Sequence, residues 1–332
     1  MESRTKENRM NSLTENLKNF ARDEGADLAG VAPVDRFHEA PKMTHPCGIL
    51  PDAKAVVVIG IKYPDAAIDQ WGKSPAESMF FYQSVQLYMT TTVMPMIQFK
   101  IYRFLEKAGY LALPVAPSGF FRYRDYKEMK GGFIADFSHR HAAVAAGLCE
   151  FGRQGLLLTP EFGVRQRLCS IITNAPLIAD PLFRGPSLCD GCEACLKACP
   201  ADAFHKTEQH SVRIGDKALT YAKVDKWRCA WVEQLGMVGE GGPKYGGYTT
   251  DVPPPDPVKK EDYLAAMGKR DPFQATCGWG TISCGRCLHA CQAHKQKNPK
   301  IMVGARCSAP DVGHAQRAPT GICNSYSTKN LK

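Results

Sequence analysis

The sequence contains no apolar run long enough to cross a membrane. A membrane span of about 20 residues rarely tolerates charged side chains. Four polar or charged residues interrupt the longest candidate, near residues 85–105: Gln86, Gln98, Lys100 and Arg103. Residues 1–9 are charged and contain no arginine-rich or apolar leader. We therefore expect a cytoplasmic protein without a transmembrane helix.

The chain also has no segment in which charge of one sign is concentrated. Its net charge of +9 could attract nucleic acid, an acidic electron donor or an anionic substrate. Because the Lys and Arg residues are spread along the sequence, charge alone favours none of these partners. With 332 residues and 44% hydrophobic content, the chain can bury a full core and has room for two domains.

Cysteines are abundant, and eight of the fourteen form a pattern that indicates two [4Fe-4S] clusters. The first group has the bacterial ferredoxin spacing C-x2-C-x2-C-x3-C-P, in which three thiolates hold one cluster and the fourth binds the other. This crossing rule assigns one cluster to Cys189, Cys192, Cys195 and Cys291. It assigns the other cluster to Cys199, Cys229, Cys284 and Cys287.

Zinc and disulfides are the simpler alternatives, because cysteine pairs also bind tetrahedral zinc. Zinc needs two pairs and no more, whereas this chain has a trio, then Cys-Pro, then a second cysteine group. Cys277 lies shortly before Cys284 and could replace Cys229 as a ligand. Two tail cysteines have no assigned role: Cys307 and Cys323. Apolar surroundings indicate buried small side chains for Cys149 and Cys169.

Helical periodicity is clear in the first part of the chain. A capping-box pattern at Ser12–Glu15 predicts a helix that begins there and ends at Gly25. A second, mostly helical region covers residues 78–107, with Pro95 as a candidate kink and Gly109 in the position of a C-terminal cap.

Short apolar runs between the helices predict strands, and the run at 55–61 is rich in valine and isoleucine, as in a central strand. The turn at 160–163 predicts a hairpin between 155–159 and 164–173. The remaining segments are strands at 27–32 and 111–115, an irregular loop at 117–132, and a helix at 138–148. Strands that alternate with helices favour an α/β sandwich.

We expect three parts along the chain, with the first boundary near Pro181–Pro186. They are an α/β domain at 1–185, a ferredoxin-like domain at 186–295, and a C-terminal tail at 296–332. The insertion between the cysteine groups should contain loops at 239–247 and 253–255. The tail lacks periodicity, which is typical of partly disordered or surface-wrapping segments.

Four segments carry a resemblance to a known family: Ala146–Arg153, Leu156–Gly163, the cysteine run, and Val224–Trp231. Together they resemble the cobalamin-dependent iron–sulfur reductases, which include reductive dehalogenases and epoxyqueuosine reductases. The resemblance covers roughly residues 12–295, and the lead into Cys229 is dehalogenase-like, which favours Cys229 as the ligand. It implies a nitroreductase-like, corrinoid-binding α/β sandwich with an appended two-cluster ferredoxin domain of the bacterial type.

The resemblance also implies a direction for the electrons. They would pass from ferredoxin or flavodoxin through both clusters to a corrinoid, reduced to Co(I), which cleaves a bond in a small-molecule substrate. Clusters of this type reach the low potentials that such a supply needs. Dehalogenation is the leading expectation. Three alternatives remain open: reduction of a modified nucleoside in tRNA, flavin in place of the corrinoid, and an electron-transfer protein without its own substrate.

Several positions depart from the family pattern. The catalytic aspartate of the epoxyqueuosine reductases falls on Phe133, and Asp136 lies three residues away. Cys291 is followed by Gln292 instead of proline, and a helical-repeat extension that grips tRNA is missing. The twin-arginine leader of respiratory dehalogenases is missing as well.

A two-electron reduction needs a proton, which Tyr, Asp or His can supply. The candidates are Tyr126, Asp136 and His139, with Tyr123 and His141 nearby. Each also has a structural explanation, because tyrosines pack, aspartate caps helices and histidines lie on solvated helix faces.

Glycine and arginine supply the candidate cofactor-binding positions. Gly147 and Gly152 could let the backbone approach a flat cofactor, or could simply end a helix. Arg165 and Arg167 could bind an anionic substrate or the polar side chains of a corrinoid. An exposed strand edge is the simpler expectation for both arginines.

Overall fold

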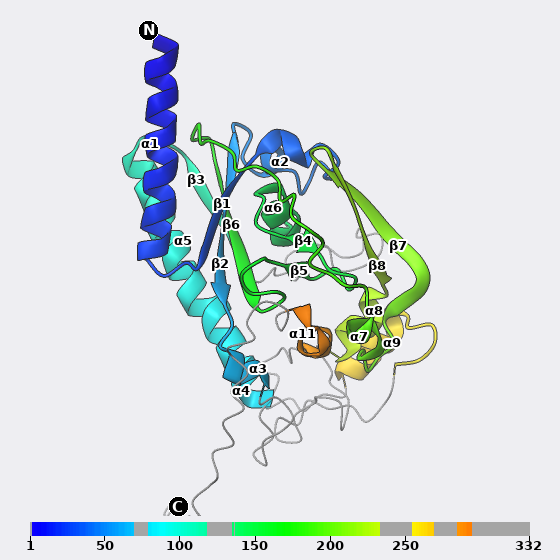
Figure 1. Cartoon of the computed structure of the whole chain (residues 1–332). Helices are drawn as coiled ribbons and strands as arrows, with labels where there is room; N and C mark the ends of the chain where they lie inside the picture. Colours follow the sequence, from blue (N-terminus) through cyan, green and yellow to red (C-terminus); the bar gives the residue numbers. More distant parts are fainter. Residues whose placement is uncertain are drawn as a thin grey trace, which may run out of the picture. The chain divides into compact units, whose positions relative to one another are not determined.

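The computed structural model describes residues 2–69, 79–117, 135, 137–232, 254–268 and 284–293. These residues belong to one compact unit, Met1–Lys297. Its centre is a four-stranded antiparallel sheet with the order β1-β2-β6-β3 (Figure 1). The strands are β1 (Leu28–Pro33), β2 (Ala55–Lys62), β3 (Ala112–Val115) and β6 (Gln166–Thr173). The mixed α/β fold and an interior position for β2 are confirmed.

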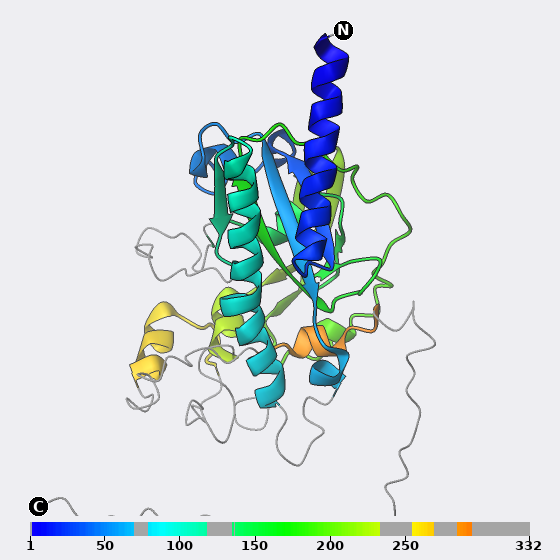
Figure 2. The ribbon, with the colours of Figure 1, turned by 90° about the vertical axis from the view of Figure 1, so that its left-hand side faces the viewer.

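Helices cover both faces of this sheet. Helices α1 (Glu2–Asp23) and α5 (Met94–Lys107) lie side by side on one face, as Figure 2 shows. Alternate residues of a strand point to opposite faces, so Val57 packs with α1 and α5 while Val58 packs with α6 (His139–Ala145). Both faces of β2 are therefore buried, which explains its unbroken apolar sequence.

The first helix begins earlier than the sequence pattern indicates. It starts at Glu2 and not at Ser12. The hydroxyl of Thr14 donates to the carbonyl oxygen of Met10 at 2.8 Å, as in a helix interior, so the Ser12–Glu15 pattern is not a cap. The helix extends back to Glu2 because residues 2–11 contain no helix breaker and several good helix formers.

The helical region before Gly109 is divided where proline forces a change. It consists of α4 (Met79–Tyr88), a π-helical turn η2 (Met89–Val93) and α5. Pro95 has no N–H to donate, and it lies in the first turn of α5, where an α-helix needs no donor. Gly109 adopts φ +87° and ends α5 as expected.

The predicted hairpin across residues 155–173 is wrong. Only a single bridge between Thr159 and Gly163 forms there. β5 (Leu157–Leu158) pairs instead with β4 (Glu150–Phe151). Strand β6 pairs with β2 along its whole length and with β3 over Ser170–Thr173.

A long hairpin precedes α8, and the sequence prediction missed it. Strands β7 (Phe204–Ile214) and β8 (Lys217–Val224) pair around Gly215, which has φ +58°. The remaining elements are short: η1 (Val34–Phe37), α2 (Pro46–Ile49), α3 (Asp65–Asp69), α7 (Ala194–Lys197), α8 (Lys226–Ala230), α9 (Lys260–Gly268) and α11 (Arg286–Ala290). Across the described residues, none of the helices is both long and apolar enough to span a membrane.

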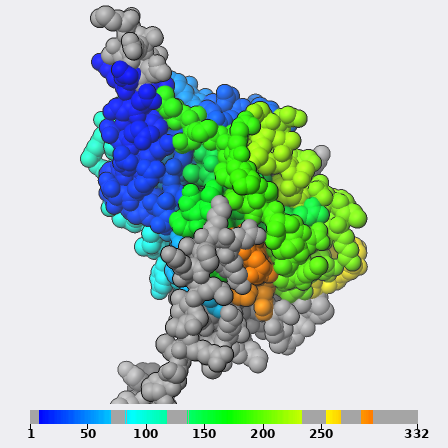
Figure 3. Space-filling view, in the orientation of Figure 1, coloured from blue at the N-terminus to red at the C-terminus, as the bar shows by residue number. Residues whose placement is uncertain are grey.

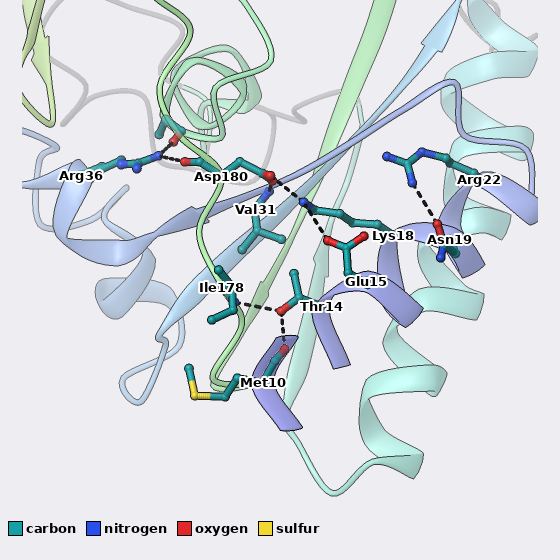
Figure 4. Close-up of polar contacts among 11 residues, drawn as sticks. Met10, Thr14, Glu15, Lys18, Asn19, Arg22, Val31, Arg36, Ile178 and Asp180 are labelled. Atoms are coloured by element: carbon teal, nitrogen blue, oxygen red, sulfur yellow. Dashed lines mark hydrogen bonds and ion pairs between the residues drawn. The ribbon is translucent and has the colours of Figure 1, made fainter. Parts of the chain in front are cut away.

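Asp180 ties the N-terminal helix to the segment that leads to the cysteines (Figure 4). Its carboxylate accepts hydrogen bonds from Lys18 Nζ at 2.5 Å and from the backbone N–H of Val31 at 2.8 Å. Its carbonyl oxygen accepts from Arg36 Nη1 at 2.7 Å. One residue therefore links α1, β1 and η1.

Most of the predicted loops lie outside the described residues. This holds for 118–132 of the first loop, for the insertion loop at 239–247, and for the tail at 296–332. Pro254 and Pro255 lie in irregular structure just before α9, as expected for a loop.

Candidate functional site: two cysteine groups and a shared cavity

Two short helices carry the cysteines, and they are built alike. The first cysteine group, Cys189–Cys199, contains α7, and the second cysteine group, Cys284–Cys291, contains α11. Both groups share the pattern C-x2-C-L-x-A-C. Each helix follows a residue in the left-handed region, with φ +58° at Glu193 and φ +59° at Gly285. Figure 3 shows the orange second group at the surface, and α7 and α11 contact each other.

The thiols of the two groups lie close enough to influence one another. Burial, together with the neighbouring thiols of Cys291 and Cys189, raises the pKa of Cys195 to about 12. Burial also raises the pKa of Cys291, with contributions from Cys189 and Cys192. These four are the ligands that the crossing rule assigns to one cluster. Thiolates crowded in this way need positive charge nearby, which iron supplies.

The second ligand set is brought together in the same manner. Burial raises the pKa of Cys287 to about 12, with further contributions from Cys284 and Cys199. Cys229, on α8, opens onto the same cavity as these three cysteines. Cys195 also acts on Cys287, so the two sets are adjacent. The assignment of each ligand remains a prediction.

The described cysteines form no disulfide. Three of the chain's cysteines, Cys277, Cys307 and Cys323, lie outside the described residues. Across the ranges that the structure describes, no three His, Cys, Asp or Glu side chains are close enough to hold a single metal ion. A [4Fe-4S] cluster differs from a single ion, since its four thiolates each bind a separate iron atom. As expected, Cys149 and Cys169 are buried in the core.

Polar groups fix the backbone around the ligands. The carboxylate of Glu150 accepts from the N–H of Leu188 at 2.5 Å and from the hydroxyl of Ser187 at 3.0 Å, directly before Cys189. Asp225 caps α8 by accepting from the N–H groups of Trp227 and Arg228 at 2.9 and 3.0 Å. The cap begins the short helix that carries Cys229.

A cavity of about 440 Å³ separates the cysteines from the sheet. Its size is within the range of ligand and cofactor sites. Its lining includes four cysteines, Cys199, Cys229, Cys284 and Cys287. It also includes Tyr63, Tyr82, His139, Gln166 and Arg167.

His139 lines this cavity, but both of its ring nitrogens are engaged. Nε2 lies 2.8 Å from the carbonyl oxygen of Ala116, and Nδ1 lies 3.0 Å from the hydroxyl oxygen of Ser170. A carbonyl only accepts, so Nε2 carries the proton and Nδ1 accepts from Ser170. Burial lowers the pKa of His139 to about 4, which keeps the ring neutral at pH 7. Its role as a proton donor remains a prediction.

Of the other candidate proton donors, His141 alone lies within the described residues. Tyr123, Tyr126 and Asp136 lie outside the described residues, as does Phe133. His141 is hydrogen-bonded to Ser138 at 2.6 Å and packs against the ring of Phe151. Burial lowers its pKa to about 4, so the expected solvated helix face is wrong for this residue.

The two predicted glycines face protein atoms. A Cβ atom on Gly147 would lie 1.9 Å from the carbonyl oxygen of Pro181, and its φ of +72° also favours glycine. A Cβ atom on Gly152 would lie 2.7 Å from Oε1 of Gln154. Close packing explains the absence of a side chain at both positions, and their contact with a cofactor remains a prediction.

Arg165 is buried, so an exposed strand edge is wrong for this residue. Its guanidinium binds Asp65 at 2.8 Å and Asp69 at 2.5 Å, both on α3. Burial acts to lower its pKa, but the hydrogen bonds to Asp69 and Asp65 outweigh burial and raise it. Its binding to a cofactor remains a prediction. Arg167, two residues further along β6, lines the cavity.

Three residues around the site were missed from the sequence: Tyr82, Glu150 and Gln154. Glu150 lies within the Ala146–Arg153 segment, whereas Tyr82 and Gln154 belong to no motif, and each meets the cysteine groups only through the fold. The β7–β8 hairpin did leave a signal, because alternating residues flank Gly215-Asp216, a common two-residue turn.

Comparison with known proteins identifies the chemistry of the first cysteine group. Residues 184–205 match a family described as a 4Fe-4S binding domain. Tetrachloroethene reductive dehalogenase from Sulfurospirillum multivorans is 43% identical over 108 residues, which are 32% of this chain and 20% of that protein. Epoxyqueuosine reductase from Synechococcus sp. (strain CC9605) is 41% identical over 64 residues, 19% of each chain. These matches support the resemblance to the cobalamin-dependent iron–sulfur reductases.

Both named relatives are reductases, and so are enzymes. The matched segments span only about one fifth of each relative's length. A solved reductive dehalogenase, for which B12-dependent dehalogenation has been suggested, is 16% identical with a TM-score of 0.48. That match covers 82% of this chain and 36% of the dehalogenase.

Proposed function

We propose that this chain is a corrinoid-dependent reductase that passes electrons through two [4Fe-4S] clusters and reductively cleaves a bond in a small-molecule substrate. Dehalogenation is the leading reaction. The observation that carries the proposal is the cavity, whose lining includes four cluster cysteines together with residues of the α/β sheet. A molecule bound there would lie directly beside one predicted cluster.

The residues present fit both kinds of cofactor. Eight cysteines in two adjacent sets match the number of thiolates that two clusters need. The cavity lining is mainly apolar with a few polar groups, which is typical of cofactor sites. When bound, a corrinoid supplies a strongly reducing cobalt centre that can cleave carbon–halogen and carbon–oxygen bonds. Flavin is the rival occupant in a nitroreductase-like sandwich.

The chain's own residues would bind and orient the substrate. Arg167 brings positive charge to the cavity and suits an anionic group. Gln166 Nε2 donates to the carbonyl oxygen of Leu157 at 2.9 Å, which fixes this wall of the cavity. Tyr126, Asp136 and His139 remain the candidate proton donors, and His139 would have to break one of its two hydrogen bonds to act.

Metal analysis after anaerobic purification with corrinoid supplied tests the proposal. We expect about eight iron atoms and one cobalt atom per chain. Iron without cobalt or flavin would overturn the proposal. Replacing Cys192 with Ser should remove about half of the iron, whereas Cys47→Ser, at a half-buried cysteine outside both groups, should remove none. Unchanged iron in Cys192→Ser would show that the ligand assignment is wrong.

Reduction of a modified nucleoside in tRNA is the second candidate, supported by the epoxyqueuosine reductase relatives. The net charge of +9 permits such binding. A tRNA-binding protein should lose affinity steeply as salt rises, because counterions are released from the phosphates. Binding of tRNA with such a salt slope, and no turnover of halogenated substrates, would favour this candidate.

We also propose an electron donor and a division of the chain into domains. Ferredoxin or flavodoxin would be the electron donor, in the cytoplasm. The domains would be residues 1–185 for the corrinoid, 186–295 for the clusters, and 296–332 as a tail. A chain that exchanges electrons with a donor, but binds neither corrinoid nor flavin, would instead be an electron-transfer protein without its own substrate.

A further inference from the structure

Gln154 presents a buried carboxamide to the first cysteine group. The residue is 4% exposed, and its Oε1 atom lies 3.5 Å from the sulfur of Cys195. The other end of the amide, Nε2, is buried and has no hydrogen-bond partner among the residues that the structure describes. A buried polar group left in this state destabilises the folded protein. The sequence retains an amide here although an apolar side chain would avoid that cost.

The turn that carries Gln154 is held on several sides. Arg153 O accepts from the N–H of Ala222 in β8 at 2.8 Å. Gly155 O accepts from Arg140 Nη1 at 2.7 Å. Gly152 leaves the space that the amide occupies, since a Cβ atom there would lie 2.7 Å from Gln154 Oε1. The amide is therefore placed against Cys195 by a fixed backbone.

The protonation state of Cys195 decides which end of the amide faces it. As a thiol, the sulfur can donate to Oε1. As a ligand of iron it is a thiolate, which only accepts. Half a turn about the last side-chain bond exchanges Oε1 and Nε2 and presents two N–H donors to the sulfur. The same rotation gives the buried amino group the partner that it lacks.

We propose that Gln154 donates an N–H···S hydrogen bond to Cys195 and thereby raises the reduction potential of the cluster on Cys189, Cys192, Cys195 and Cys291. Reduction adds one electron and one negative charge to the cluster. A hydrogen bond to a ligand sulfur stabilises the more negative, reduced state more than the oxidised state, so the potential rises. The inference rests on the proposed ligand set, and it needs neither a corrinoid nor a substrate.

The residue before Gln154 also contacts the first cysteine group, which indicates that this turn helps to position the group. Arg153 Nε lies 3.6 Å from Glu193 Oε1, in the residue that precedes α7. Consecutive side chains of one turn therefore reach two residues of the Cys192–Cys195 loop. Burial of the sulfur makes the contact stronger, because a hydrogen bond weakens less where water is excluded.

The decisive experiment is a redox titration followed by EPR on the iron-loaded full chain, comparing wild type with Gln154→Leu. Leucine has a similar size and no donor. We expect one cluster to become harder to reduce, with a roughly tenfold lower ratio of reduced to oxidised cluster at fixed potential, which is about 59 mV for one electron. The other cluster should keep its potential. Two unchanged potentials with full iron content would overturn the proposal.

A second measurement does not depend on how well that variant folds. Wild-type protein with ¹⁵N in the glutamine side-chain amides should show a hyperfine coupling from the reduced cluster in pulsed EPR. Gln292 follows Cys291 directly and serves as the matched control. The coupling should persist in Gln292→Leu, and its loss there would overturn the proposal. Cobalt content and turnover enter neither measurement, so failure of the proposed enzyme activity would be seen separately.

Discussion

The two cysteine groups share a local sequence, but they are attached to the rest of the protein by different kinds of contact. Polar side chains hold the first group: Glu150 binds the backbone before Cys189, and Gln154 lies against Cys195. Apolar packing supports the second group, in a cluster that also takes in Cys189 of the first. The ring of Tyr82 lies against Gly285, and Leu288 joins Tyr82 in an apolar cluster.

Polar and apolar contacts affect different properties of a cluster. Polar contacts near a sulfur change its electrostatic environment, and therefore the potential of the cluster. Apolar contacts change mainly stability and access of water. The first group is thus the better candidate for tuning of the potential, and the second for exclusion of water from the cavity.

The largest expected effect comes from filling the space at Gly285. Gly285→Ala would place a methyl group 2.7 Å from the Tyr82 ring at a φ of +59°. The backbone strain and the overpacking together should cost roughly 2–5 kcal/mol. We expect a lower midpoint of thermal unfolding and loss of iron from both clusters, since the second cysteine group supplies ligands to each predicted set.

Gly191→Ala is the matched control for that change. Gly191 also has a positive φ, of +72°, but a Cβ atom there meets nothing within 4 Å. Gly191→Ala should lose only about 1–2 kcal/mol of stability, from backbone strain. Equal losses in the two variants would mean that packing of Tyr82 does not hold the second group.

Removing the polar anchor of the first group should have the next largest effect. Glu150→Ala leaves the buried N–H of Leu188 without its acceptor, at a cost of about 1–3 kcal/mol. Unfolding and iron retention measure the result. Glu150→Gln keeps one oxygen acceptor and should lose less. If Gln is as damaging as Ala, the negative charge, and not the hydrogen bond, holds this loop.

Asp225→Ala tests whether Cys229 depends on purely local support. The variant removes the cap of α8 and should cost about 0.5–2 kcal/mol. Asp225→Ser keeps an acceptor and should recover most of that loss in denaturant unfolding. We expect slower cluster loading in the alanine variant. Cys229 lies outside both cysteine groups, so its position depends on the short helix α8 and not on a C-x2-C loop. Normal loading in Asp225→Ala would contradict this.

The smallest effect is expected at Glu193, the counterpart of Gly285 in the first group. Glu193→Gly removes the cost of a side chain at φ +58° but also loses the contact with Arg153 and adds freedom to the unfolded chain. The net change in the free energy of unfolding should be a stabilisation of at most about 1 kcal/mol. Arg153→Ala isolates the ion pair. A clear loss of stability in Glu193→Gly would show that the ion pair dominates.

The cysteine groups could be found from sequence because their geometry is encoded within a few residues. The spacing of Cys192, Cys195 and Cys199 fixes a loop and one helical turn, whatever surrounds them. The same holds for the buried strand β2 and the glycine cap at Gly109, where local composition and conformation agree.

Other features depend on partners that are distant in sequence. The hairpin predicted at 155–173 failed because β6 is paired with β2 and β3, which a local pattern cannot reveal. Gln154 is 41 residues from Cys195, and its proposed role depends entirely on that contact. The start of α1 was missed for the opposite reason, because a plausible cap at Ser12 lies inside a longer helix-forming stretch.

The hydrogen bonds of Asp180 have a consequence for biosynthesis. Lys18 and Val31 leave the ribosome long before Asp180, with which they pair across 162 and 149 residues. Since domains tend to fold as they emerge, α1 cannot acquire its final contacts until the last strand of the sheet has been made. We expect stalled nascent chains to resist protease at α1 only after Asp180 has cleared the exit tunnel, when the first cysteine group is next to appear.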